Sequence, residues 1–233
     1  MDLEKFVRYS SGTLRTDKFA KTIGYGCGSI GHLLAIAAHK DSDVSTGLKQ
    51  ISSNISMARY VIRFTGAFES YDALKNGSWC YGDDDKHIQQ IVRLQAYSML
   101  IYYPLEHISY VGYVAPKLIK MDANWYMRQS CWAWTAYVAL DIYANQLRII
   151  KLNKREKELL GKKDIEEEER KRELTSIRKR RKELYFLQLR NACFFPTCLH
   201  WSLERGCIPE PLVQFLCFIE AITGFWRTWV NFN

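Results

Sequence analysis

The chain has 233 residues, of which 48% are apolar and 14% are aromatic, and its formal net charge is +8 at pH 7. This composition excludes a low-complexity disordered chain, because such chains lack the aromatic residues that build a core. The mean hydropathy of −0.25 indicates apolar residues interleaved with charges. The positive charge favours an anionic partner, either nucleic acid or an acidic membrane surface.

Apolar residues recur at helical spacing along nearly the whole chain, and the alternation typical of strands is nearly absent. We therefore expect an all-α protein of five or six helices. The clearest of them are predicted at about 16–39, 43–73, 86–102, 122–150 and 211–230. Pro104 is expected to stop the third helix, because proline interrupts the helical hydrogen bonding.

The first predicted helix contains Gly26-Cys27-Gly28-Ser29-Ile30-Gly31, a G-x-G-x-x-G pattern of the kind that binds a dinucleotide. No β-branched strand precedes it and the chain lacks βαβ alternation, so a nucleotide-dependent enzyme is disfavoured. On a helical wheel, Gly24, Gly28 and Gly31 instead share one narrow face. Such a face indicates close approach by another helix, for intramolecular packing or for self-association.

The segment 44–68 has the most informative pattern in the chain. Its isoleucines and phenylalanines gather on one side of a helix, and its cations gather with serines on the other. Such a helix is suited to lie in a membrane interface, where each cation gains on the order of 1 kcal/mol at an anionic leaflet. An ordinary amphipathic core helix is the other interpretation. The residues expected to bind the membrane are Lys49, Ile51, Ile55, Arg59, Ile62, Arg63 and Phe64.

Two helical segments, at about 125–145 and 211–231, carry aromatic residues of the kind found at membrane interfaces. Both are weakly hydrophobic, and the second contains Glu220 and Arg227, which would have to face other helices or pair. The expected fold is therefore a membrane-associated helical protein. It would have an amphipathic interfacial helix and one or two weakly hydrophobic membrane-embedded helices.

The segment 151–183 is dense in charges, and its acids precede its bases at the stabilising i,i+4 spacing. We expect it to be a charged helical linker between an N-terminal helical region, 1–150, and a C-terminal one, 184–233. Its basic part, 170–182, supports an alternative function as a soluble helical adaptor or nucleic-acid-binding protein. The adjacent acidic block would weaken the attraction to phosphate.

No constellation of side chains indicates catalysis, a cofactor or a metal site. The five histidines are scattered, and the seven cysteines contain no C-x-x-C pair. Cys193, Cys198 and His200 are conceivable zinc ligands, but reduced thiols are the favoured interpretation. We expect a protein that is not an enzyme and that has no cofactor.

Five segments in the same order resemble the peroxin-11 family of peroxisomal membrane proteins, and its gamma-type branch in particular. They are the stretch Leu14–Gly26, the element Tyr102-Tyr103-Pro104-Leu105-Glu106-His107, the tryptophan-rich helix Trp125–Trp134, the pair His200-Trp201, and the proline turn before the last helix. The charged segment 151–183 departs from the family pattern. Glu106 and His107 are expected to pair locally, with no catalytic role.

This resemblance implies a non-enzymatic protein of the peroxisomal membrane that promotes peroxisome elongation, proliferation and fission. The helix at 44–68 would insert into the cytosolic leaflet of an anionic phospholipid membrane, and the protein would self-associate. Its further partners would be a fission machinery, formed by a dynamin-like GTPase and its receptors. Both termini would face the cytosol, and nucleic acid is not an expected partner.

Overall fold

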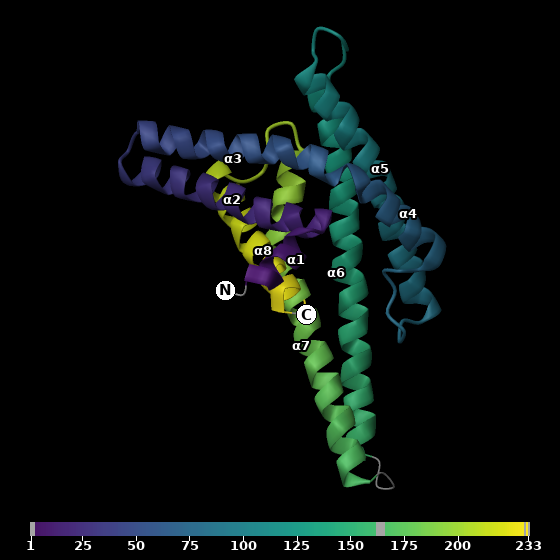
Figure 1. Cartoon of the computed structure of the whole chain (residues 1–233). Helices are drawn as coiled ribbons and strands as arrows, with labels where there is room; N and C mark the ends of the chain where they lie inside the picture. Colours follow the sequence, from purple (N-terminus) through teal and green to yellow (C-terminus); the bar gives the residue numbers. More distant parts are fainter. Residues whose placement is uncertain (1–2, 162–165, 231, 233) are drawn as a thin grey trace.

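The computed structural model describes residues 3–161, 166–230 and 232, which form eight α-helices, one short 3-10 turn and no strand (Figure 1). The predicted all-α class is therefore confirmed. The elements are α1 (Leu3–Ser10), α2 (Thr13–Ala37), α3 (Asp43–Ile62), the 3-10 turn (Arg63–Thr65), α4 (Gly66–Asn76), α5 (Lys86–Val114), α6 (Ala123–Gly161), α7 (Glu167–Ser202) and α8 (Glu210–Val230).

Helices α2 and α3 run antiparallel and form an arm that projects from the rest of the protein (Figure 1). The start of α3 is fixed by a reciprocal cap. The Ser42 hydroxyl accepts a hydrogen bond from the Ser45 N–H at 3.2 Å, and the Ser45 hydroxyl accepts one from the Ser42 N–H at 2.9 Å. Two backbone donors that the helix leaves free are thereby satisfied, which sets the direction in which α3 returns along α2.

The glycines of α2 bring its backbone close to α3. A Cβ atom added at Gly31 would lie 2.9 Å from the backbone oxygen of Ser45, and one at Gly28 would lie 2.7 Å from the hydroxyl oxygen of Ser52. Gly24 faces Ile55 in the same way. These contacts lie within the chain, and a role of the glycines in self-association stays a prediction.

Replacement of Gly31 by alanine is expected to lower the free energy of unfolding by about 1–3 kcal/mol, because the new methyl group would push the backbone of α3 away. Gly47 of α3 is the matched control, since a Cβ added there meets nothing within 4 Å. Gly47→Ala should instead raise the stability by up to about 1 kcal/mol through helix propensity. Urea unfolding of both variants measures the difference, and equal effects would contradict the close packing of α2 on α3.

Two predicted helix boundaries differ from the structure. The helix expected over 43–73 is interrupted by the 3-10 turn, and Gly66, which starts α4, leaves no room for a Cβ atom against the ring of Tyr103. Helix α5 continues through Pro104 to Val114, so the predicted stop near residue 102 is wrong. Proline removes one helical hydrogen bond. Tyr102 and Glu106, on either side of Pro104, are buried, and the Tyr102 hydroxyl donates a hydrogen bond to the Glu106 carboxylate. This buried contact across the proline holds the helix together.

Helices α6 and α7 pair along their length in a long hairpin (Figure 1). The charged segment 151–183 contributes the end of α6 and the start of α7, and its residues 162–165 lie outside the described residues. An apolar seam joins the two helices through Ile149, Leu152, Leu159, Ile177, Leu184 and Leu187. Apolar side chains spaced among the charges therefore form a contact between helices.

Helix α8 packs against α2 and α7 and brings the C-terminal end of the chain beside α1 (Figure 1). The hydroxyl oxygen of Tyr9 lies 2.6 Å from that of Thr228. The Tyr9 ring also meets the rings of Phe225 and Trp229 edge-on. These contacts fix α1 to the last turns of α8.

Among the residues described, no helix combines the length and the apolar character that crossing a membrane requires. The predicted embedded segment 125–145 lies in α6, and residues 211–230 lie in α8, with residue 231 outside the described part of the chain. The predicted membrane-embedded helices are therefore not confirmed.

Candidate functional site

The side of α3 that faces the protein is polar, and a large part of its outer side is apolar. Its buried residues are Ser45, Ser52 and Arg59. Val44 and Ile51 are 64% and 47% exposed. The predicted amphipathic pattern is thus present, but its polar arc is turned toward α2 and not toward solvent.

Arg59 explains this orientation, because it forms a two-point ion pair with Asp17 of α2. Its Nε lies 2.8 Å from Asp17 Oδ1, and its Nη2 lies 3.3 Å from Oδ2. The two residues are only 4% and 8% exposed. Paired hydrogen bonds of this kind satisfy a guanidinium and a carboxylate together. The pair fastens α3 to α2 and removes Arg59 from the surface.

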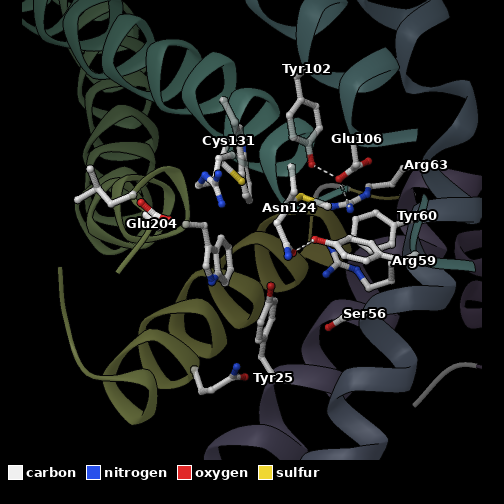
Figure 2. Close-up of a pocket in the computed structure, with 17 residues that line it drawn as sticks. Tyr25, Ser56, Arg59, Tyr60, Arg63, Tyr102, Glu106, Asn124, Cys131 and Glu204 are labelled. Atoms are coloured by element: carbon white, nitrogen blue, oxygen red, sulfur yellow. Dashed lines mark hydrogen bonds and ion pairs between the residues drawn. The ribbon is translucent and has the colours of Figure 1, made fainter. Parts of the chain in front are cut away.

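Arg63 is held by a single contact with Glu106 of α5, which is 1% exposed. Arg63 Nη2 lies 2.5 Å from Glu106 Oε1, and the hydroxyl of Tyr102 donates a hydrogen bond to the same oxygen (Figure 2). Burial raises the pKa of Tyr102 well above its ordinary value, so the hydroxyl stays protonated as a donor. The three groups join the base of the arm to α5.

The expected local pairing of Glu106 with His107 is wrong. The ring nitrogens of His107 lie 2.6 Å from the backbone oxygen of Tyr103 and 3.1 Å from that of Tyr60. Because Tyr60 belongs to α3, His107 is a second link between α5 and the arm. The Tyr102–His107 element therefore anchors α3.

A third buried carboxylate, Glu220 of α8, forms an ion pair with Lys21 of α2. Arg190 of α7 approaches the same carboxylate at 3.9 Å. The acidic residue within the weakly hydrophobic C-terminal segment is thus neutralised by other helices. Buried charges are stable only when they are paired in this way.

Five exposed apolar side chains of α2 and α3 lie on one common face of the arm. On α2, Ile23, Ile30 and Leu34 lie roughly 100° around the helix from the glycines that contact α3. On α3, Val44 and Ile51 lie roughly 90° from the contact line in the same sense of rotation. Because the helices are antiparallel, both stripes come to the same side. We call these five exposed residues the outer face.

The residues predicted to bind a membrane divide into two groups. Ile51 and Phe64 are exposed, Ile62 is half-buried, and Ile55 packs on Gly24. Lys49 is half-buried, with its Nζ 2.5 Å from Asp41 Oδ1, and Arg59 and Arg63 lie in the ion pairs described above. The structure therefore brings apolar members of the set to the surface and turns its two arginines inward.

Sequence reasoning missed Asp17 and Glu106 as partners of these arginines. Glu106 lines a pocket of about 470 Å³, together with Tyr25, Tyr60, Arg59 and Arg63 (Figure 2), and Asp17 is bound to the Arg59 of this lining. The amphipathic pattern of α3 contains a signal for such partners, because an arginine that lies on the buried side of a helix needs a carboxylate from another helix. Which carboxylate it uses depends on the tertiary arrangement.

Two other sequence features have structural explanations. The G-x-G-x-x-G pattern lies in the middle of α2, whereas a dinucleotide site needs a helix N-terminus that follows a strand. In the basic segment, Arg178 and Arg181 pair with Glu156, and Arg180 pairs with Glu183. These ion pairs reduce the charge that the segment offers to a nucleic acid.

An all-helical chain with ion pairs inside and an apolar outer face is typical of proteins that bind a membrane or another protein through that face. Residues 3–229 match the family model of Peroxisomal biogenesis factor 11, and the chain belongs to this family. It is thus a peroxisomal membrane protein with a role in peroxisome biogenesis.

Two curated relatives carry the name Peroxisomal membrane protein 11C, in agreement with the gamma-type resemblance. The mouse protein is 24% identical over 211 residues, which cover 88% of this chain and 86% of the relative. The human protein is 21% identical over 139 residues, which cover 60% of this chain and 57% of the relative. No solved structure matches the chain.

Proposed function

We propose that this chain shapes the peroxisomal membrane by inserting the outer face of the α2–α3 arm into the cytosolic leaflet. The observation that carries this proposal is the outer face itself, with large apolar side chains exposed on two antiparallel helices and the ion pairs of the arm turned inward. A wedge in one leaflet enlarges that leaflet relative to the other and so bends the membrane. Many such wedges would elongate the organelle before fission.

Apolar burial supplies the main driving force for this insertion. Full burial of an isoleucine, leucine or valine gains about 1.5–3 kcal/mol, so a half-exposed one gains on the order of 1 kcal/mol when it enters the membrane. The net charge of +8 adds attraction to an anionic leaflet. Because Arg59 and Arg63 are bound to carboxylates, these two cations contribute little to that attraction.

Self-association and fission complete the proposed function. Association of many copies would concentrate the arms in one region of membrane and draw it into a tubule. A dynamin-like GTPase and its receptors would then divide the tubule. Both steps are inferred from what the resemblance to the peroxin-11 family implies.

The purified full-length chain should sediment with vesicles of phosphatidylcholine mixed with phosphatidylserine and should convert them into tubules visible by electron microscopy. Vesicles of phosphatidylcholine alone should bind less protein, because the electrostatic contribution is lost. The soluble-adaptor alternative requires protein in the supernatant and binding to nucleic acid through residues 170–182. A chain that leaves both kinds of vesicle unbound and unchanged would overturn the proposal.

A further inference from the structure

A second cavity, of about 150 Å³, lies at the root of the arm, where α2 meets α5, α7 and α8. Two carboxylates line it, Asp17 and Glu220, against five cations, Lys18, Lys21, Arg59, Arg63 and Arg190. Three of these cations are matched within the protein, Arg59 by Asp17, Lys21 by Glu220 and Arg63 by Glu106. Among the described residues Lys18 has no such ion pair, and Arg190 has only contacts at 3.9 Å with carboxylates that other groups already bind, so positive charge is in excess here.

Neither Lys18 nor Arg190 has a carboxylate within hydrogen-bonding distance in the described part of the chain. Oxygens of Asp141 and Glu220 come only to 3.9 Å from Arg190, and Asp141 already accepts a hydrogen bond of 2.6 Å from Asn191. The pKa of Lys18 is lowered to about 8, first by burial and then by the charge of Arg190. A lysine in this situation lacks the anion that would stabilise its charge.

Two hydrogen-bond donors at the cavity are also unused. The Nε atoms of Arg63 and Arg190 are buried and have no hydrogen-bond partner among the described residues. A buried donor without a partner costs about 1–3 kcal/mol, and more when it belongs to a charged group. An oxyanion removes this cost, because its oxygens accept several hydrogen bonds at once and match the geometry of a guanidinium.

We propose that this cavity binds a phosphate-class oxyanion through Lys18, Arg63 and Arg190. Inorganic phosphate and the terminal phosphate monoester of a lipid headgroup share this chemistry. A bound anion would connect α2, at the root of the arm, to α7, and would thereby hold the arm against the rest of the protein. The cavity is lined by none of the outer-face residues, so occupancy of the site and insertion of that face are separable.

The test uses the full-length chain in neutral detergent micelles, titrated with inorganic phosphate by calorimetry at constant ionic strength, with chloride as the reference anion. Lys18→Gln should weaken phosphate binding about tenfold, because a charge-assisted hydrogen bond is lost. Lys157→Gln is the matched control, since it makes the same charge change on an exposed residue in the last turns of α6. Arg190→Lys keeps the positive charge but loses the Nε donor, so it should weaken phosphate binding several-fold. It serves as the second variant if Lys18→Gln does not fold.

A pH series separates binding at Lys18 from a purely structural role. With sulfate, whose charge is constant over this range, affinity should fall as pH rises through about 8 in the unchanged chain, because Lys18 loses its proton there. Lys18→Gln should remove this dependence. The charged and titratable groups that face Lys18 or share the cavity with it are Asp17, Lys21, Arg59, Arg63, Glu69, Tyr102, Tyr103, Arg190, Glu220 and Arg227.

A lipid titration identifies the source of the anion. If the chain binds micelles that contain phosphatidic acid more tightly than it binds free phosphate, and Lys18→Gln weakens both, the ligand is a lipid headgroup. Tighter binding of free phosphate would support the soluble anion. The proposal is overturned if phosphate, sulfate and phosphatidic acid give no more heat than chloride, or if Lys18→Gln and Lys157→Gln weaken binding equally.

Discussion

Ile51→Asp is expected to weaken binding of the full-length chain to anionic vesicles by roughly 30-fold or more. Ile51 is exposed on the outer face, so the substitution removes an apolar gain of about 1 kcal/mol. It also places a carboxylate where the proposed insertion requires an apolar group, which costs at least about 1 kcal/mol more. A total of about 2 kcal/mol corresponds to a factor of roughly 30 in the dissociation constant.

The adjacent residue supplies the control for this experiment. Gln50 is exposed on α3 outside the outer face, and Gln50→Asp makes the same change in charge. Its vesicle affinity should stay within about threefold of the unchanged chain. Both variants should keep their helical circular dichroism, because neither side chain is buried. Equal weakening by the two substitutions would assign the effect to charge alone and would contradict insertion of the outer face.

Loss of Glu106 should have the largest effect on stability among single substitutions in the arm and its supports. Glu106→Leu would leave the Arg63 guanidinium buried without its carboxylate and the Tyr102 hydroxyl without its acceptor. Breaking a buried ion pair from one side costs about 3–5 kcal/mol. The free energy of unfolding in urea should fall by that amount.

A double-mutant cycle separates the interaction free energy between Arg63 and Glu106 from the effects of the two single substitutions. Arg63→Met combined with Glu106→Leu removes both charges, and the double variant should recover about half or more of the stability that Glu106→Leu loses. Additive losses in the cycle would show that the two residues do not interact. The apolar double variant should still bind vesicles, because the outer face is unchanged.

Helical spacing predicts the apolar side of α3 but not the neighbour of its polar side. A helical wheel gives the relative directions of Ile51 and Arg59, and both directions are found in the structure. The wheel does not say that Asp17 and Glu106, which lie 42 and 43 residues from their arginines, come to meet the polar side. Solvent-facing and carboxylate-facing arginines have the same pattern in the sequence, and only tertiary packing distinguishes them.

Pro104 illustrates the same limit for a helix boundary. Its missing N–H predicts a stop, because the local cost of proline in a helix is about 3 kcal/mol. Besides the hydrogen bond between Tyr102 and Glu106, Glu106 pairs with Arg63 and the Tyr102 ring contacts Trp134, and these contacts with residues distant in the chain offset that cost. Local signals therefore place helices well, but they place boundaries poorly where tertiary contacts continue a helix.

The role of the α2 glycines as a helix contact can be predicted from sequence, because it depends on the neighbouring segments and on the helical spacing, which the sequence contains. The absence of a preceding strand argues against a phosphate site, and the common direction of Gly24, Gly28 and Gly31 on a helical wheel indicates a helix contact. In the structure each of these glycines faces α3, and Gly28 also faces Gln214 of α8. That α3 is the partner follows from the short connection between the helices.

Depth-dependent quenching tests insertion of the outer face most directly. A fluorescent amino acid introduced at position 51 or at position 53 of the full-length chain is measured on anionic vesicles whose lipids carry brominated acyl chains. Ser53 is exposed on α3 away from the outer face. Strong quenching at position 51 and weak quenching at position 53 is the expected result. Equal quenching at both positions, or none at either, would contradict insertion of the arm by this face.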